Sequence, residues 1–164
     1  MFRLTAALVT GLAALPIALA TPAMAMASTA TPVSMTFDEP VLENVNSDCP
    51  AFGLPNGGFC GNGVVVPYGH ATEMIAFGVA CGGGCDVRTV TLSSGSIVMD
   101  EYATGGACFG ACAGPEPPGR GTLSDVIVGG TGIFTGATGK LSGTVTVTSL
   151  QSQVQLSGTI TLPS

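Results

Sequence analysis

The stretch that decides the fold is at residues 129–139 and reads GGTGIFTGATG. It holds five glycines in eleven residues, between an apolar run at 125–128 and an alternating segment at 141–148. Glycine permits positive φ angles and close backbone approach, so the stretch predicts a tight, irregular crossover between two strands. Phe134 is the aromatic residue of this stretch, and we expect its side chain to pack into the core and anchor the crossover there.

The segments around this stretch read as strands. Residues 141–148 and 153–162 alternate between apolar and polar side chains, the period-2 pattern of strands that face a core on one side and water on the other. Short, regularly spaced strands with glycine-rich turns indicate an all-β sandwich or barrel, and eight strands suit a closed antiparallel barrel whose interior is filled or holds one small ligand. The eight predicted strands, with no convincing helix, are 31–39, 63–68, 71–79, a hairpin over 86–102 that supplies two, 122–128, 141–148 and 153–162.

The glycine stretch also resembles the GGTG-x-F-x-x-A-x-G signature of the dirigent and allene oxide cyclase-like β-barrels. The family often has a basic residue after GGTG, where this chain has Ile133. The resemblance favours the barrel over the sandwich and covers the rest of the mature chain weakly. The matching residues are Gly129, Gly130, Thr131, Gly132, Phe134, Ala137 and Gly139.

What the resemblance implies about activity is limited. Dirigent proteins steer the coupling of phenoxy radicals, and allene oxide cyclases hold an unstable fatty-acid epoxide while it closes. Membership would therefore imply a barrel that controls ring closure or radical coupling by its shape and a few polar groups. Only the glycine-stretch positions carry over, because the catalytic carboxylates and tyrosines of either family have no match in this chain.

The N-terminus has the pattern of a secretory signal peptide. A positive charge at Arg3 precedes the apolar run 4–20, and small-residue sites follow, with cleavage expected after Ala25 or Ala27. A retained membrane anchor is the alternative, but no basic stop-transfer cluster follows the apolar run. We therefore expect a signal peptide at 1–27, a single β-barrel domain at 28–164, and a secreted, extracellular protein.

The charge of the chain and the motifs in it limit the classes of molecule that we expect the protein to bind. Without Arg3 the chain has three basic against ten acidic residues, a net charge of −7, which disfavours nucleic acid and anionic membrane as partners. The single histidine cannot build a cupin-type metal cluster, and the chain has no P-loop or nucleophile elbow. We expect no cofactor and no metal; an apolar or aromatic small molecule is the expected partner, and the oligomeric state stays open.

Six cysteines behind a signal peptide predict three disulfides. A Cys49–Cys60 bridge would close the loop-like segment 41–61. If the 86–102 hairpin turns at Ser94-Gly95, Arg88 pairs with Glu101 and the same register brings Cys81 opposite Cys108. This favours Cys81–Cys108 and Cys85–Cys112. The alternatives are two local bridges, Cys81–Cys85 and Cys108–Cys112, or a four-thiolate metal site built from the same cysteines.

Glu73, Arg88 and Glu101 are the candidate catalytic residues, because all three fall on interior faces of neighbouring predicted strands. An acid in an apolar lumen has a raised pKa and can exchange a proton near neutrality, and an arginine there can stabilise a developing oxyanion. The alternative interpretation is a structural Arg88–Glu101 pair at the barrel rim.

Tyr68, His70 and Tyr102 are the candidate ligand-binding residues, since a phenol or imidazole near a barrel mouth can hydrogen-bond a ligand. Their ordinary roles are packed aromatic rings and an exposed loop histidine. The favoured function is a small barrel that binds an apolar or aromatic molecule in its lumen. The alternatives are a cofactor-independent dirigent- or cyclase-like isomerase and a structural domain with a filled barrel.

Overall fold

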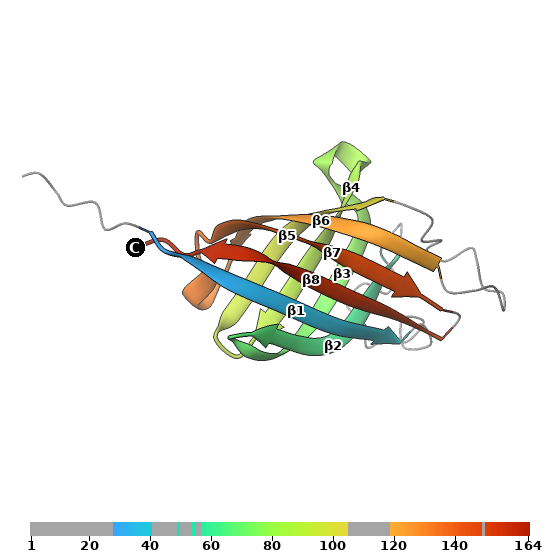
Figure 1. The fold of residues 1–164 in the computed structure, drawn as a ribbon. Coiled ribbons are helices and arrows are strands. Elements are labelled where there is room, and N and C mark those ends of the chain that lie inside the picture. Colours follow the sequence, from blue (N-terminus) through green and yellow to red (C-terminus); the bar gives the residue numbers. More distant parts are fainter. Residues whose placement is uncertain (1–27, 41–48, 50–53, 55–56, 105–118, 149) are drawn as a thin grey trace, which may run out of the picture.

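The protein is an all-β closed barrel of eight antiparallel strands, seen in a computed structural model (Figure 1). The structure describes residues 28–40, 49, 54, 57–104, 119–148 and 150–164. Each strand pairs with the next in the chain, and β8 closes the barrel on β1, which confirms the predicted fold class. The strands are β1 (Ala30–Pro40), β2 (Gly58–Val66), β3 (Gly69–Ala80), β4 (Cys85–Leu92), β5 (Gly95–Thr104), β6 (Gly119–Gly130), β7 (Thr138–Val147) and β8 (Gln151–Thr161), with short 3-10 turns η2 (Cys81–Gly83) and η3 (Gly132–Phe134).

Two strands begin inside segments that the sequence predicts to be loops. β2 starts at Gly58, inside the segment 41–61 that reads as a loop, and β6 starts at Gly119, inside the proline- and glycine-rich connector 113–121. Gly58 pairs with Ala76 of β3, so cross-strand bonding extends the strand into residues of poor strand propensity. No helix among the described residues is long and apolar enough to span a bilayer.

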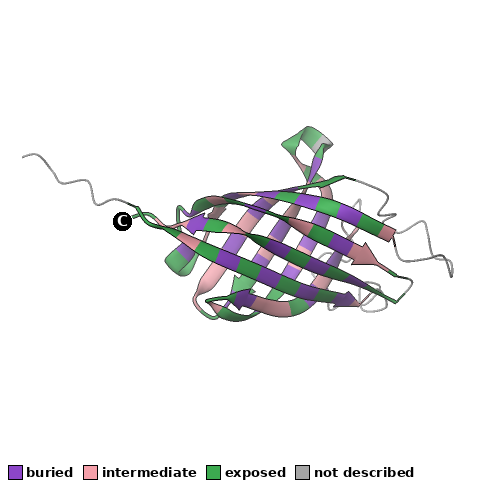
Figure 2. Cartoon of the chain, viewed as in Figure 1, coloured by how far each residue is buried: buried purple, intermediate pink, exposed green. Residues whose placement is uncertain are grey.

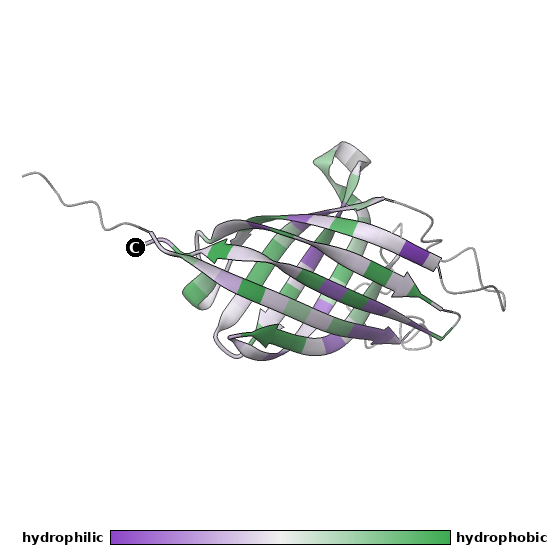
Figure 3. Cartoon of the chain, in the orientation of Figure 1, coloured by the Kyte–Doolittle hydropathy of each residue, from purple (hydrophilic) through white to green (hydrophobic). Residues whose placement is uncertain are grey.

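Buried and exposed positions alternate along the strands, and the hydropathy of the chain follows the same alternation (Figures 2 and 3). Side chains of one parity fill the lumen and those of the other parity face outward. A side chain without accessible surface leaves no water-sized space beside it, so the apolar half of the lumen is filled. The apolar residues with 0 % exposure are Met35, Val65, Val90, Ile97, Met99, Phe134 and Ile160.

The glycine stretch forms the predicted tight, irregular connection between β6 and β7 and docks on the end of the β4–β5 hairpin. Because β6 and β7 are antiparallel neighbours, this connection, called the crossover below, is a hairpin loop. The Thr131 N–H donates to the Ser96 carbonyl (2.9 Å) and the Ile133 N–H to that of Ser94 (3.1 Å). Gly132 has a φ of +60°, and a Cβ there would lie 2.1 Å from the Ser94 carbonyl oxygen, so only glycine fits. Phe134 is fully buried, as predicted, and packs edge-to-face against Tyr68 at 5.0 Å between ring centroids.

The register of the β4–β5 hairpin differs from the prediction by two residues. Leu92 pairs with Gly95, so the turn is Ser93-Ser94, and Arg88 stands opposite Met99 instead of Glu101. Gly95 does not form the turn; a Cβ there would lie 2.1 Å from the Thr131 carbonyl oxygen, so this glycine serves the close approach of the crossover. A shift of two residues preserves the faces, so Arg88 and Glu101 still share the lumen side.

The disulfides are Cys49–Cys60, as predicted, and Cys81–Cys85. The favoured pairs Cys81–Cys108 and Cys85–Cys112 are therefore wrong, and the local alternative for the first two cysteines is confirmed. The error came from extending the hairpin register beyond β4, whereas the β3–β4 turn brings the Cys81 and Cys85 Cα atoms to 5.4 Å. Cys108 and Cys112 lie outside the described residues.

Replacing Phe134 by alanine should lower the free energy of unfolding by roughly 3–5 kcal/mol, because the ring is lost from a filled core. Chemical denaturation of the purified protein measures this. The control is Ile133→Ala next to it, whose side chain is half exposed and whose loss should change stability by about 0.5 kcal/mol or less. Equal effects of the two substitutions would contradict the role of Phe134 as the anchor of the crossover.

Candidate functional site

Five charged side chains lie together inside the barrel, and we refer to them as the charged layer. They come from five strands, β1, β3, β4, β5 and β6. Buried charges are rare in proteins unless they are paired, so a group of this size in a small barrel needs a physical explanation. The members and their exposures are Glu39 (1 %), Glu73 (4 %), Arg88 (1 %), Glu101 (1 %) and Asp125 (0 %).

Strand alternation places each of these residues in the lumen. Glu39 follows Val33, Met35 and Phe37 on the inward face of β1, and Asp125 stands between Leu123 and Ile127 on that of β6. Glu101 and Asp125 are cross-strand partners in the β5–β6 ladder. The layer is therefore fixed by backbone pairing before any side-chain contact is considered.

Arg88 is the centre of the charged layer. Its Nε donates to Glu101 Oε2 (2.6 Å), and its Nη1 donates to Glu39 Oε1 (3.2 Å) and to Glu73 Oε2. β1 and β4 are not neighbours in the barrel, so the Arg88–Glu39 ion pair crosses the lumen. The Arg88–Glu101 pair is buried, which corrects the alternative prediction of an exposed pair at the rim.

Gly61 of β2 makes space for the layer. A Cβ at this position would lie 3.0 Å from both Glu73 Oε1 and Glu39 Cγ, and 2.7 Å from the Asp38 carbonyl oxygen. Glycine here allows the carboxyl groups of β1 and β3 to approach the backbone of the strand between them. The sequence carried no signal of this role, because Gly61 lies in a segment that reads as a loop.

Four buried oxygen atoms near Arg88 have no hydrogen-bond partner within the described part of the chain. They are Glu73 Oε1, both carboxyl oxygens of Asp125, and the hydroxyl oxygen of Ser152. Ser152 is fully buried and is the cross-strand partner of Glu39. Buried polar atoms are almost always hydrogen-bonded, so these four mark a place with uncommitted bonding capacity.

Burial is the largest cause of the pKa shifts of Glu73 and Asp125 in the charged layer. Burial and, to a smaller extent, the negative charge of Glu101 together raise the pKa of Asp125 to about 8, and Arg88 opposes the shift. Burial likewise raises the pKa of Glu73 well above its ordinary value, against the attraction of Arg88. Burial acts to lower the pKa of Arg88, but the surrounding glutamates outweigh it and keep the guanidinium charged.

At neutral pH the layer therefore sets one neutral carboxyl group, Asp125, and a second acid of raised pKa, Glu73, beside one permanent cation, Arg88. Neutral buried acids can donate a proton or a hydrogen bond, and a guanidinium can stabilise a developing negative charge. The structure brings together the three predicted catalytic residues, Glu73, Arg88 and Glu101. Sequence reasoning missed Glu39 and Asp125, although both continue an inward alternation along their strands.

The three predicted ligand-binding residues do not meet. Tyr68 packs on Phe134 at the crossover, while Tyr102 is 42 % exposed on the outer face of β5. His70 is exposed at the start of β3, beside an open groove of about 620 Å³ on the outside of the barrel. None of the three contacts the charged layer through a hydrogen bond among the described residues.

The carboxyl groups of the layer do not form a metal site. Among the described residues, the group with three possible ligand atoms within 4.8 Å of one another is Cys81, Cys85 and Asp100, and its two cysteines form a disulfide. Comparison of the chain with protein-family models, with curated proteins and with solved structures finds no match.

Arg88→Met should lower the free energy of unfolding by roughly 3–5 kcal/mol, because it leaves buried carboxylates without their counter-charge. Denaturant unfolding is the measurement, and Arg120→Met is the control, since Arg120 is exposed on β6. Adding Glu101→Gln to Arg88→Met should recover part of the loss. A stable Arg88→Met variant would show that the guanidinium does not hold the layer together.

The stability of the protein should fall as the pH rises from about 4 to about 8. A carboxyl whose pKa is raised by folding binds its proton more tightly in the native state, so its contribution is complete below the unfolded pKa and is lost through about 8. Asp125→Asn should flatten this slope in urea unfolding measured at several pH values. Asp38→Asn, at an exposed position on β1, should leave it unchanged.

Proposed function

We propose that the barrel binds an amphipathic aromatic small molecule in its lumen, against the charged layer. The head of the ligand is a hydrogen-bond donor, such as a hydroxyl or an amine, and it faces the layer. The observation that carries the proposal is the set of buried oxygens on Glu73, Asp125 and Ser152 that have no hydrogen-bond partner within the described chain. Each of these side chains offers at least one acceptor, since a protonated carboxyl group keeps its carbonyl oxygen.

The packing of the barrel limits where a ligand binds. The apolar half of the lumen, from Phe134 to Met99, is filled by its own side chains. On β3 the inward position after Glu73 is Ile75, whose cross-strand partner is Phe59. The Phe59 ring meets that of Phe77 edge-to-face, with centroids 5.3 Å apart. Aromatic and aliphatic groups therefore stand one layer away from the carboxyls, as an amphipathic ligand requires.

The charge of the layer determines which head group of a ligand is favoured. The layer has four carboxyl groups to one guanidinium, and the guanidinium is already bound to three of them. A donor or cationic head supplies what the unpartnered oxygens lack, whereas an anionic head meets like charge in a poorly solvated place. The proposed ligand is therefore a phenol or an amine, and not a carboxylate.

A second function is favoured by the acids of raised pKa beside Arg88. In this alternative the protein is a cofactor-independent isomerase in which Glu73 and Glu101 exchange a proton with the substrate and Arg88 stabilises the negative charge that develops. Ring closure or radical coupling is the chemistry that the resemblance to dirigent and allene oxide cyclase-like barrels suggests. Glu73→Gln and Glu101→Gln would then keep binding and abolish turnover.

Export from the cell is also part of the proposal. The two disulfides of the described chain, Cys49–Cys60 and Cys81–Cys85, are typical of an oxidising compartment. Together with the N-terminal signal pattern they support a secreted barrel that meets its ligand outside the cytosol.

Matched ligands test the binding proposal. 4-Propylphenol and 4-propylbenzylamine should raise the melting temperature of the protein, while 4-propylbenzoate should not. A ligand at 100 times its Kd stabilises the native state by about 2.7 kcal/mol, which a thermal scan resolves.

The double variant Glu73→Gln/Asp125→Asn should no longer distinguish the phenol and the amine from the benzoate. The control variant Asp38→Asn, at an exposed position, should still distinguish them. Equal stabilisation by the benzoate would contradict the role of the carboxyls. Failure of the phenol and the amine to stabilise the wild type would favour a barrel whose interior is filled throughout.

A further inference from the structure

The Cys81–Cys85 disulfide lies at the β3–β4 turn, which projects from the barrel in Figure 1. The two sulfur atoms differ in access, because Cys81 is exposed at the start of η2 while Cys85 is 5 % exposed at the start of β4. An incoming group therefore reaches Cys81 first. This asymmetry is what a disulfide needs if one cysteine is to be attacked and the other is to leave.

The backbone at this bridge is unusual. Cys81 has a φ of +51° and is the one residue other than glycine with positive φ in the described part of the chain. Such a conformation costs free energy in a residue with a Cβ and persists where the surroundings impose it. Residues 82–84 are all glycine, so the turn can change its conformation when the bridge opens.

The bridge adds little to the fold. It joins residues four apart in sequence, and the ladder already pairs Ala80 with Cys85. The Cys49–Cys60 bridge joins residues 11 apart in sequence, Cys60 in β2 and Cys49, which belongs to no strand. Loop-closure entropy grows with the length of the closed loop, so Cys81–Cys85 constrains the unfolded chain less than Cys49–Cys60 does.

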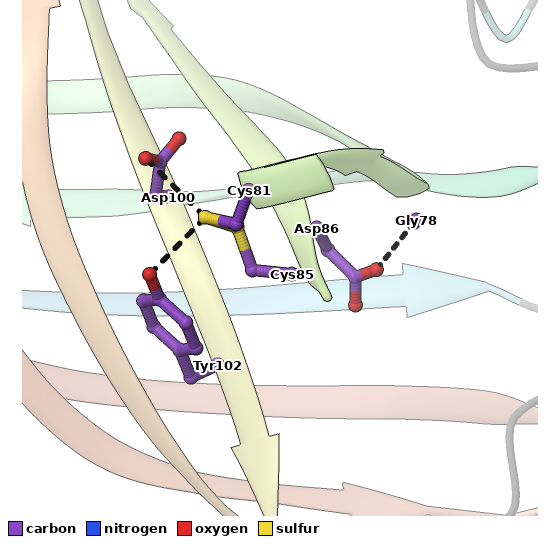
Figure 4. The surroundings of a disulfide bond; sticks show 6 residues. All are labelled: Gly78, Cys81, Cys85, Asp86, Asp100 and Tyr102. Atoms are coloured by element: carbon purple, nitrogen blue, oxygen red, sulfur yellow. Dashed lines mark hydrogen bonds between the residues drawn. A yellow bond between two sulfur atoms is a disulfide. The ribbon is translucent and has the colours of Figure 1, made fainter. Parts of the chain in front are cut away.

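Two polar side chains of β5 face the exposed sulfur (Figure 4). The Tyr102 hydroxyl lies 3.1 Å from Cys81 Sγ, and Asp100 Oδ2 lies 3.6 Å from it. A phenolic O–H can donate to a thiolate and stabilise its charge, and a carboxylate can accept the proton of a thiol. Tyr102 therefore stands where it can donate a hydrogen bond to a Cys81 thiolate, and Asp100 where it can take up the proton of a thiol.

We propose that Cys81–Cys85 is a thiol–disulfide exchange site that oxidises low-molecular-weight thiols. A thiolate attacks Cys81 Sγ, the Cys81–Cys85 bond breaks, and Cys85 leaves as a thiolate that takes up a proton. A second thiolate attacks the incoming sulfur of the mixed disulfide and releases Cys81, whose charge Tyr102 stabilises. Two thiols become one disulfide, and the two electrons reside on the reduced cysteines.

Graded reduction of the full oxidised protein tests the proposal. The protein is incubated with increasing reduced glutathione, quenched with iodoacetamide and mapped by peptide mass. Cys81 and Cys85 should be alkylated at a glutathione concentration at least ~tenfold below that needed for Cys49 and Cys60. Co-reduction of both bridges at the same concentration would overturn the proposal.

Variants separate an exchange site from a merely exposed bridge. Cys85→Ser should form a mixed disulfide with oxidised glutathione at Cys81, and Tyr102→Phe should slow reduction by glutathione several-fold. Tyr68→Phe is the control, because Tyr68 packs on Phe134 in the crossover. The double variant Cys81→Ser/Cys85→Ser should melt close to the wild type. An unchanged rate in Tyr102→Phe, or a large loss of stability in the double variant, would contradict the proposal.

Discussion

The arrangement of the lumen depends on the buried ion pairs that Arg88 makes with three glutamates. The Arg88 guanidinium binds carboxyl groups from β1, β3 and β5, so one side chain of β4 ties together strands on both sides of the barrel. The contact with Glu39 crosses the interior, which backbone pairing alone cannot do. Buried ion pairs add little to the stability of a protein compared with apolar packing. Removing one partner nevertheless lowers the free energy of unfolding strongly, because the other charge is left buried and unpaired.

The two halves of the lumen have different physical characters. Towards the glycine crossover, Phe134 and the apolar side chains around it fill the space, and the backbone of the crossover locks onto the β4–β5 hairpin. In the charged layer some buried oxygen atoms lack a hydrogen-bond partner within the described chain, and burial raises the pKa of Glu73 and of Asp125, the latter to about 8. Both parts of the lumen are closed to water, since the members of the charged layer are 0–4 % exposed, and the two parts differ in their polar groups.

Much of this architecture could be predicted from the sequence, because the alternation of apolar and polar residues indicates strands and glycine-rich stretches indicate the turns between them. The alternation also placed Glu73, Arg88 and Glu101 on the lumen side, even though the hairpin register was two residues off. What the sequence could not show depends on contacts between distant segments. Gly95 looks like a turn residue and in fact makes room for Thr131, and the pairing of Cys81 depends on the shape of one turn. Asp125 and Glu39 continue the inward alternation of their strands, so the sequence pattern could have placed them in the lumen too.

Inside the barrel, burial raises the pKa of two carboxyl groups, Glu73 and Asp125, beside one permanent cation, Arg88. Carbon-13 NMR of the side-chain carboxyls, followed from pH 3 to pH 10, measures this directly, with Asp125→Asn used to assign one signal. The account predicts that the Asp125 carboxyl titrates near 8 and that of Glu73 well above the ordinary range of a glutamate. Titration of both groups near 4, as in solvent-exposed acids, would contradict it.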